Sequence, residues 1–455
     1  MFKEMSQTAI NNYFDSAGEK AEIKNRFMPG VYSKYNVKRG LRNEDGTGVL
    51  VGLTEIGDVH AYVYEGTEKV PVEGRLFYRG IDVFEFCEGF VSEDRFGFEE
   101  CVYLLLFGEL PDKHELEKFQ NVLGSHRKLS DDFVRANILN APSRDIMNKL
   151  ARLVLVLYSY DNNPDETSVR NMLRQSVDLI SKFPLMAAYG YQAKSHYLEG
   201  KSLYIHNPSP ELSTSENILK LLRPSGEYTD LEAKVLDLAL VLHAEHGGGN
   251  NSTFAAHVVS SSGTDIYSAL AAAIGSLKGP KHGGANAKVI GMMDELKSEV
   301  KDWGSEKQIR DYLTRIVRKQ AFDRSGLIYG VGHAVYTLSD PRCVLLKKQA
   351  ERLAKQVGRN DELELYKNVE KLAPVVFREI KGIDKPMCAN VDFYSGFVYD
   401  MLGIPKEMNT PIFAIARVAG WCAHIIEEQL NGGRIIRPAY KNIKECTKYV
   451  KMADR

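Results

Sequence analysis

The chain has 455 residues, of which 44% are hydrophobic and 26% charged, a composition typical of a globular protein with a sizeable core. This length excludes a peptide-sized or disulfide-stapled fold and predicts one large domain or two. The 59 Lys and Arg residues balance 60 Asp and Glu residues, and no long basic stretch interrupts that balance. Nucleic acid is therefore not an expected partner.

The cysteines and the first residues predict a cellular compartment. The six cysteines are scattered, without a C-x-x-C pair or a spacing suited to zinc, so we expect reduced thiols and no metal site. The first twenty residues mix acids and bases without an apolar core, unlike a signal or transit peptide. No apolar run approaches the roughly 20 residues that a membrane span needs. We expect a soluble cytoplasmic protein without a membrane partner.

Residues 40–80 form the one region where β structure is expected, because β-branched and aromatic residues alternate there with Gly, Asn and Asp turn signals. The remainder is predicted to be helical. From Phe98 the pattern predicts a helix, a stop at Pro111 and a second, amphipathic helix. Surface loops are expected at 205–218 and at 358–363. The predicted fold class is mainly α and multi-helical, with a short β region near the N-terminus.

Two predicted helices end in glycine-rich turns that carry histidine. Thr229 and Glu232 form a capping box before a helix that is apolar nearly all round and ends near Gly247. A second helix, from about Asp265, is stopped by a Gly-Pro pair directly before His282. Both turns therefore place ionisable groups at the ends of buried helices.

Three glycine-punctuated stretches are candidate catalytic segments. They are GPKHGGAN with His282, YGVGHAVY with His333 and CANVDFYSG with Asp392. Ionisable residues in loops carry much of enzyme catalysis. Asp392 could instead cap the helix that the following residues predict, and the two roles do not exclude each other.

The other histidines favour ordinary structural roles. His243 and His246 are spaced H-x-x-H, which lacks the H-E-x-x-H pattern of a zinc helix. His243, His257 and His424 each lie within an apolar helical pattern and are expected to be hydrogen-bonded core residues. The run GVGH lacks a complete G-x-G-x-x-G and does not follow a strand, so dinucleotide binding is not expected.

Five segments occur in an order that resembles the citrate synthase family, of the si type: HAEHGGGN, GPKHGGAN, GVGHAVYTLSDPR, NVDFYSG, and IARVAGW followed by RIIRP. RLFYRGIDVFEF and YLLLFGELP extend the resemblance to about Gly40. It implies an almost all-α fold of two domains, a large helical domain of residues 1–283 and 404–455 and a small inserted domain of residues 284–403. It also implies a homodimer whose active sites use both subunits.

The resemblance implies an acyltransferase of the tricarboxylic acid cycle, which condenses acetyl-CoA with oxaloacetate and hydrolyses the citryl thioester to citrate and CoA. No cofactor or metal is implied, since the CoA thioester is a substrate. Asp392 would remove the methyl proton while His282 donates to the thioester oxygen, because the enolate needs stabilisation as it forms. His333 would polarise or protonate the ketone of oxaloacetate.

The resemblance also assigns the binding residues. His246, Arg342, Arg417 and Arg437 match those that hold oxaloacetate, a dianion suited to forked guanidinium donors, and Arg437 would reach into the partner's site. A loop would approach CoA closely through its main chain. Its residues are Leu327, Ile328, Tyr329, Gly330, Val331 and Gly332.

The sequence departs from the family pattern at two places. Residues 336–338 are uncharged where many relatives carry a basic residue, which puts one CoA phosphate contact in doubt, although Lys347 or Lys348 could replace it. Glu245 stands where Asp is common and Gly247 where Glu is usual, so the surroundings of His246 are expected to differ.

Three other functions remain open. A 2-methylcitrate synthase using propionyl-CoA shares the same motifs. Phe393 and Tyr394, the bulky residues after Asp392, could form the walls of the acyl pocket and would then favour the smaller acetyl group. An inactive helical scaffold or regulator is a second alternative, which the retention of all the catalytic residue types disfavours. A metal-dependent hydrolase built on His243, His246 and His257 is the third.

Overall fold

A computed structural model describes residues 6–28, 30–43, 46–66, 68–333, 335–382, 385–431 and 433–455. The chain divides into two compact units, Met1–Leu53 and Thr54–Arg455. All the predicted catalytic and substrate-binding residues belong to the second unit.

The first unit contains one helix of 19 residues and two short ones. Its elements are α1 (Gln7–Asn25), α2 (Val31–Lys34) and η1 (Arg39–Leu41). α1 begins where the Ser6 hydroxyl accepts a hydrogen bond from the Ala9 amide.

The β structure expected before residue 54 does not form. Among the described residues of the first unit, only an isolated bridge joins Arg42 to Gly48. Leu50 and Leu53 are 86% and 92% exposed, so this segment has no buried face. A strand is stabilised by an extended set of cross-strand pairs and by a buried side, and the sequence pattern alone did not reveal that the described residues here have one bridge and no buried side.

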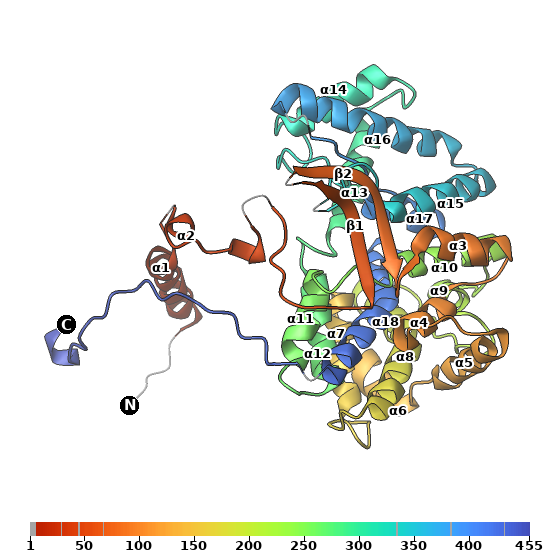
Figure 1. Cartoon of the computed structure of the whole chain (residues 1–455), viewed down its shortest axis with the longest axis horizontal. Coiled ribbons are helices and arrows are strands. Elements are labelled where there is room, and N and C mark those ends of the chain that lie inside the picture. Colours follow the sequence, from red (N-terminus) through yellow and green to blue (C-terminus); the bar gives the residue numbers. More distant parts are fainter. Residues whose placement is uncertain are drawn as a thin grey trace. The chain divides into compact units, whose positions relative to one another are not determined.

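The second unit begins with an antiparallel sheet in the order β1-β2-β3 (Figure 1). Its strands are β1 (Gly57–Glu65), β2 (Glu68–Tyr78) and β3 (Ile81–Asp82). Gly57 pairs with Tyr78 at the open end of the hairpin. The Tyr78 hydroxyl donates to the main-chain oxygen of Val241 at 2.9 Å, which ties the sheet to the helices. The predicted β region is thus confirmed for residues 57–82.

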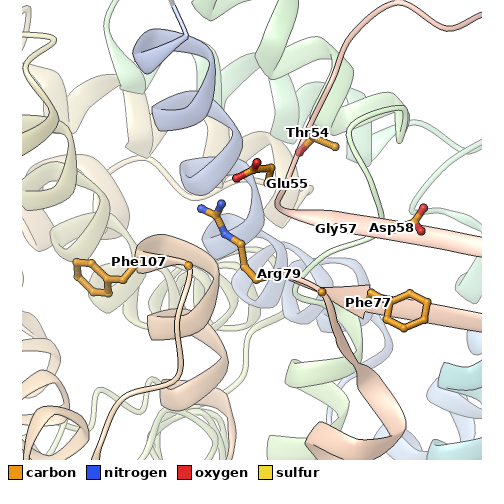
Figure 2. A pocket seen from close by; sticks show the side chains of 9 residues that line it. Thr54, Glu55, Gly57, Asp58, Phe77, Arg79 and Phe107 are labelled. Carbon is orange, nitrogen blue, oxygen red and sulfur yellow. The ribbon is translucent and has the colours of Figure 1, made fainter.

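A pocket of about 770 Å³ opens beside the start of β1 (Figure 2). The Arg79 guanidinium donates to the main-chain oxygen of Leu105 there, at 2.9 Å through Nη2. None of the predicted catalytic residues lines it. Its lining is Thr54, Glu55, Gly57, Asp58, Phe77, Arg79, Gly80, Phe107 and Gly108.

Helices make up most of the rest of the second unit, which confirms the mainly α fold. They are α3 (Val83–Ser92), α4 (Phe98–Phe107), α5 (Lys113–His126), α6 (Asp131–Phe133), η2 (Val134–Leu139), α7 (Ile146–Tyr158), α8 (Val169–Glu199), α9 (Thr214–Leu222), α10 (Asp230–His243), α11 (Asn251–Ser260), α12 (Ile266–Lys278), α13 (Ala285–Glu299), α14 (Glu306–Val317), α15 (Pro341–Val357), α16 (Asn360–Lys381), α17 (Val391–Met401), η3 (Lys406–Met408), α18 (Asn409–Leu430) and η4 (Met452–Asp454). Within the described residues, no helix is long and apolar enough to cross a membrane.

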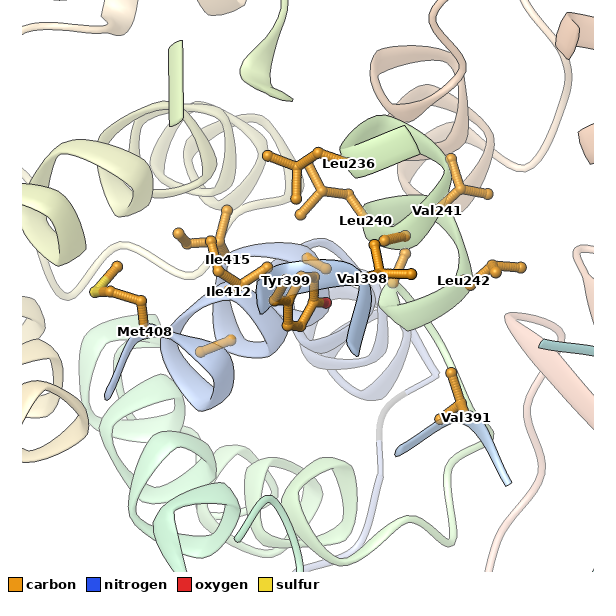
Figure 3. Packing of buried hydrophobic residues seen from close by; sticks show 14 of the residues in the cluster. Leu236, Leu240, Val241, Leu242, Val391, Val398, Tyr399, Met408, Ile412 and Ile415 are labelled. Carbon is orange, nitrogen blue, oxygen red and sulfur yellow. The ribbon is translucent and has the colours of Figure 1, made fainter. Parts of the chain in front are cut away.

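α18 lies at the centre of the core, where it packs against α4, α8, α10, α11 and α12. Leu236 and Leu240 of α10 meet Ile412 and Ile415 of α18 and Tyr399 of α17 (Figure 3). Because its sequence is apolar nearly all round, α18 buries every face, and burial of such side chains is the main source of stability.

The helix boundaries confirm several predicted signals. Thr229 and Glu232 form the predicted capping box, with the Thr229 amide donating to the Glu232 carboxylate at 2.7 Å.

The two predicted loops are shorter than expected. The break predicted at 358–363 is only two residues long, because Gly358 ends α15 with a φ of 73° and α16 starts at Asn360. Asn360 to Leu363 are therefore helical rather than a loop. The loop predicted at 205–218 ends at Ser213, which caps α9.

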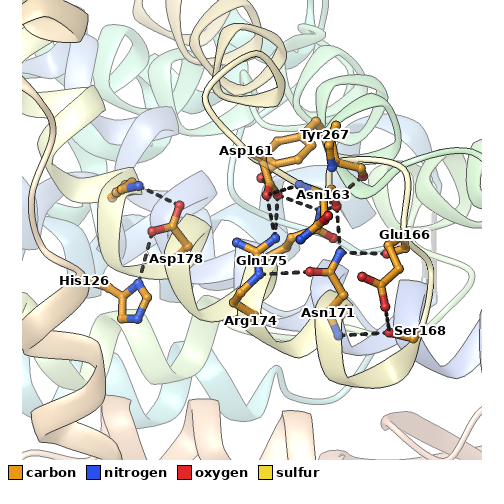
Figure 4. A network of polar contacts seen from close by, with 12 residues as sticks. His126, Asp161, Asn163, Glu166, Ser168, Asn171, Arg174, Gln175, Asp178 and Tyr267 are labelled. Carbon is orange, nitrogen blue, oxygen red and sulfur yellow. Dashed lines mark hydrogen bonds and ion pairs between the residues drawn. The ribbon is translucent and has the colours of Figure 1, made fainter.

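A polar network fixes the connection between α7 and α8 (Figure 4). The Asp161 carboxylate accepts hydrogen bonds from Arg174 at 2.6 Å, Gln175 at 2.9 Å and Tyr267 at 2.7 Å. Burial raises the pKa of Asp161, but these donors outweigh it and hold the pKa well below its usual range. The ionised carboxylate therefore joins α8 to α12 across the connection.

The predicted division into a large domain and a small domain of residues 284–403 remains a prediction. Within the second unit, α14 packs on α16, and α17 packs on both α13 and α15. In Figure 1, α14 and α16 lie at one end of the unit, and α13, α15 and α17 lie level with β1 and β2. All of them belong to the same compact unit as α18.

Candidate active site

Two of the predicted site histidines face each other. His246 follows α10, and its ring is perpendicular to that of His333, with centroids 5.4 Å apart. His333 stacks on Tyr336 at 4.9 Å. His333 Nδ1 accepts hydrogen bonds from the amides of Val335 and Tyr336, both at 3.1 Å. This leaves the ring proton on Nε2, so His333 presents a donor.

The buried Arg417 guanidinium lies beside these histidines. Its Nε donates to the main-chain oxygen of His243 at 2.7 Å. Both Nη atoms of Arg417 and Nε2 of His246 have no hydrogen-bond partner among the described residues. Burial lowers the pKa of Arg417 to about 10, so the group stays protonated at neutral pH. An unpaired buried cation is costly and is expected where an anion binds.

Arg342 is the second cation of the site, and it is already paired. It is the second residue of α15 and makes two hydrogen bonds to Asp340, Nε to Oδ1 at 3.0 Å and Nη2 to Oδ2 at 2.8 Å. Asp340 Oδ2 also accepts from the Val391 amide at 3.2 Å. The pair thus holds the start of α15 against the start of α17.

His282 lies in the turn between α12 and α13, as predicted. Its Nε2 is 3.1 Å from the Ser252 hydroxyl, which also accepts from Trp421 Nε1 at 3.2 Å. Burial, with the positive charge of Arg417, lowers the pKa of His282 to about 4. The ring is therefore neutral at neutral pH. The causes are burial and a neighbouring cation.

Asp392 occupies the first turn of α17. Asn390, and not Asp392, caps the helix, because its side chain accepts from the Asp392 amide at 3.0 Å. Burial raises the pKa of Asp392 to about 6, since the opposing effect of Arg342 is smaller and Asp340 adds to the rise. The carboxylate is thus more basic than an exposed one and remains ionised at neutral pH.

The predicted CoA loop of residues 327–332 is fastened to the same helix start. The main-chain amide of Asn390 donates to the main-chain oxygen of Gly330, and the Asn390 side chain donates to the main-chain oxygen of Gly332, both at 2.9 Å. Gly332 in turn donates to the oxygen of Cys388 at 2.8 Å. The loop therefore lies against the segment that carries Asp392.

The role of Arg437 in a partner's site stays a prediction, and two other expectations have different outcomes. Arg437 is exposed, and within the described chain no hydrogen bond or ion pair joins it to the other site residues. Phe393 and Tyr394 are fully buried, with ring centroids 5.4 Å and 6.1 Å from Tyr366, so core packing accounts for their size. Lys347 pairs with Glu370 at 2.6 Å.

Some residues that complete the site were not predicted. They are Ser252, Asp340 and Phe413. Asp340 could have been found from its place two residues before Arg342 at a helix start. Phe413 precedes Arg417 by one helical turn and lies 4.7 Å from its guanidinium carbon, a spacing typical of contacts on one helix face.

The core roles predicted for the remaining histidines are confirmed. His243 Nδ1 contacts the main-chain oxygen of Ala239 at 2.7 Å, and His257 contacts His424 at 3.1 Å. In the part of the chain that the structure describes, no three His, Cys, Asp or Glu side chains are grouped to hold a metal ion. The alternative of a metal site on His243, His246 and His257 thus has no ligand cluster.

Comparison with known proteins agrees with this geometry. Residues 45–439 match the family described as "Citrate synthase, C-terminal domain". A citrate synthase of Synechocystis is 35% identical over 84% of this chain and 89% of its own. A citrate/2-methylcitrate synthase of Bacillus subtilis is 33% identical over 80% and 89%.

A solved structure shows the same fold. It is the ternary complex of carboxymethyl coenzyme A and oxaloacetate with citrate synthase from Thermoplasma acidophilum, at 25% identity and a TM-score of 0.74, covering 92% of this chain and 99% of that one. The predicted family and fold are therefore confirmed, and the chain belongs to the citrate synthase family.

Proposed function

We propose that this protein condenses acetyl-CoA with oxaloacetate and hydrolyses the resulting thioester to citrate and CoA. The observation that carries the proposal is the buried Arg417, whose two Nη groups have no partner among the described residues and lie with His246 in one site. A compact dicarboxylate would satisfy these donors. The relative from Thermoplasma acidophilum was solved with oxaloacetate and a CoA analogue, which supports the same substrates here.

The proton transfers follow from the states of three side chains. Asp392, ionised above its pKa of about 6, takes a proton from the methyl carbon of acetyl-CoA. His282 is neutral, and it donates a hydrogen bond to the thioester oxygen as the enolate forms. His333 donates from Nε2 to the ketone as the new carbon–carbon bond forms.

The binding roles complete the proposal. Arg342 and Arg417 hold the carboxylates of oxaloacetate, since forked donors suit them. The main chain of residues 327–332 receives the CoA moiety near Asp392. Arg437, exposed in this chain, reaches the second active site of a homodimer.

A 2-methylcitrate synthase is the second candidate, because the Bacillus subtilis relative carries both activities in its name. One methylene in an apolar pocket changes the selectivity by about 1–3 kcal/mol, so the two thioesters must be compared directly. We would measure kcat/KM for acetyl-CoA and propionyl-CoA with oxaloacetate in chelator-treated buffer and identify the products. A higher value for acetyl-CoA with citrate as product supports the proposal, a preference for propionyl-CoA moves it to 2-methylcitrate, and inactivity with both favours the scaffold.

A further inference from the structure

Two histidines outside the proposed catalytic set are linked through their ring nitrogens. His257 Nε2 of α11 lies 3.1 Å from His424 Nδ1 of α18. At the outer ends, His257 Nδ1 contacts Glu428 Oε2 at 2.8 Å and His424 Nε2 contacts Glu245 Oε1 at 3.1 Å. Glu428, His257, His424 and Glu245 thus form a continuous series of hydrogen bonds, which we name the Glu-His-His-Glu chain.

The geometry of the Glu-His-His-Glu chain determines how many protons these four side chains hold. An ionised carboxylate only accepts hydrogen bonds, so each outer ring nitrogen must carry a proton. The contact between His257 Nε2 and His424 Nδ1 then needs a third proton, because two lone pairs would otherwise face each other at 3.1 Å. Two neutral rings supply only two protons. Two neutral rings between two ionised carboxylates would thus lack one proton. The Glu-His-His-Glu chain therefore holds one additional proton, which the two rings share.

Two members of the Glu-His-His-Glu chain have lowered pKa values. Burial raises the pKa of Glu245, but the charge and hydrogen bond of His424, with Arg417, outweigh it and lower the pKa, so Glu245 is ionised. Burial and His424 lower the pKa of His257. The ionised Glu245 carboxylate thus accepts the hydrogen bond at the buried end of the Glu-His-His-Glu chain.

Other charged and titratable groups also face the chain. On α18, Glu427 Oε2 lies 3.8 Å from His424 Nδ1 and also acts on His257. The groups that act on Glu245 besides His424 are Arg417 of α18, Tyr78 of β2, Arg79 after β2, and Cys101 of α4. The carboxylates of Glu427 and Glu428 thus stabilise the shared proton on the outer side, and Arg417 balances Glu245 on the inner side.

Glu245 links the Glu-His-His-Glu chain to the proposed oxaloacetate site. It directly precedes His246, and its Oε1 also accepts from the Gly247 amide. A Cβ at Gly57 would lie 2.7 Å from Glu245 Cγ, and one at Gly420 would lie 2.5 Å from Oε2. β1 and α18 therefore enclose the carboxylate tightly, and its bond to His424 determines where residues 245–247 lie.

We propose that the Glu-His-His-Glu chain holds one shared proton that fixes Glu245, and that Glu245 thereby positions His246 for the substrate. His257, His424 and Glu245 are positioning residues, since none needs to touch the substrate. The part that concerns oxaloacetate rests on the function proposed above, whereas the shared proton does not.

The shared proton is tested by NMR of protein labelled with ¹⁵N-histidine. We expect a strongly downfield imidazole N–H resonance near neutral pH that disappears in His257→Gln. Glu428→Gln keeps an acceptor but removes a charge, so the resonance should titrate away about 1 pH unit lower. The exposed His114→Gln and Glu117→Gln are matched controls that leave it unchanged. Two neutral histidines without this resonance in the wild-type protein would overturn the proposal.

Positioning is tested by steady-state kinetics on the same variants. Loss of folded protein alone lowers the apparent kcat and leaves KM unchanged. If Glu245 positions His246, His257→Gln should raise the KM for oxaloacetate at least severalfold, with a smaller change in kcat. An unchanged KM in a variant that has lost the resonance would overturn the positioning role. Inactivity of the wild-type protein would instead contradict the proposed function, and the NMR result would still decide whether the proton is shared.

Discussion

Arg417 Nε lies 2.7 Å from the main-chain oxygen of His243, which fixes the guanidinium of α18 against the end of α10. One nitrogen is thereby used for structure, and the two Nη groups remain unpaired among the described residues. Burying an incompletely paired cation opposes folding. The protein therefore maintains a preformed anion site at some cost in stability, as functional sites commonly do.

The forked shape of Arg417 should matter more than its charge. Arg417→Lys keeps the charge but removes the paired donors, so the KM for oxaloacetate should rise about 10- to 100-fold, which corresponds to losing a hydrogen bond to a charged group. Steady-state kinetics at saturating acetyl-CoA measures the KM for oxaloacetate in both proteins. Arg352→Lys, on the exposed face of α15, is the matched control. An unchanged KM in Arg417→Lys would remove this residue from the binding site.

The raised pKa of Asp392 predicts a pH dependence of stability. Its folded pKa of about 6 exceeds the ordinary value of 3.8, so the folded state binds the proton more tightly than the unfolded state. Stability is therefore lost as pH rises from about 4 to 6, by up to about 3 kcal/mol. Asp392→Asn lacks this loss, so its stability relative to wild type should be higher at pH 8 than at pH 4. Urea unfolding checks this, and an equal difference at both pH values would refute it.

The same pKa governs catalysis. Because the base must be ionised, kcat/KM for acetyl-CoA should fall about tenfold per pH unit below about 6 and level off above it. Asp392→Asn should lower kcat by about 100- to 10,000-fold. Asp400→Asn changes an exposed carboxylate on the same helix and should keep the wild-type profile. A wild-type profile that stays flat down to pH 5 would exclude Asp392 as the base.

Ser252 should affect the chemical step more than oxaloacetate binding. Its hydroxyl contacts both His282 and Trp421, so Ser252→Ala frees the His282 ring and leaves the indole N–H unpaired. We expect kcat to fall about tenfold, a nearly unchanged KM for oxaloacetate, and a loss of about 1–3 kcal/mol in unfolding free energy. Steady-state kinetics measures kcat and KM, and urea unfolding measures the loss of stability. A rise in KM without a change in kcat would contradict this role.

Two glycines of the CoA loop offer a matched comparison. Both have positive φ, 79° at Gly330 and 95° at Gly332, so Ala strains either position. At Gly330 a Cβ would also lie 2.8 Å from Phe393 and 2.9 Å from Val289, whereas at Gly332 no atom of the described residues, its two chain neighbours aside, lies within 4 Å. Gly330→Ala should therefore lower both stability and kcat more than Gly332→Ala. Equal effects would show that the close approach to Phe393 is unimportant.

The sequence predicted the elements whose signals are local. The Thr229 capping box and the glycine-rich turn at His282 rely on neighbouring residues, and both were found. The part of the predicted β region before residue 54 formed no strand among the described residues, because strand formation depends on a partner that local sequence does not specify. Asn360, Asp361 and Glu362 are polar yet helical, because the αL conformation of Gly358 ends α15 and α16 starts two residues later.

The site was predictable in its residue types but not in its physical state. Motif order identified His282, His333 and Asp392, yet the pairing of Arg342 with Asp340 and the unpaired Nη groups of Arg417 depend on contacts between distant segments. The bond between His257 and His424 joins residues 167 positions apart. No sequence spacing could have revealed it.

The most direct test is CoA thiol release from acetyl-CoA by the purified protein, with and without oxaloacetate, for wild type, Asp392→Ala and Asp400→Asn. The account predicts rapid release that requires oxaloacetate, persists in Asp400→Asn and is lost in Asp392→Ala. Release that does not need oxaloacetate, or that continues in Asp392→Ala, would contradict it.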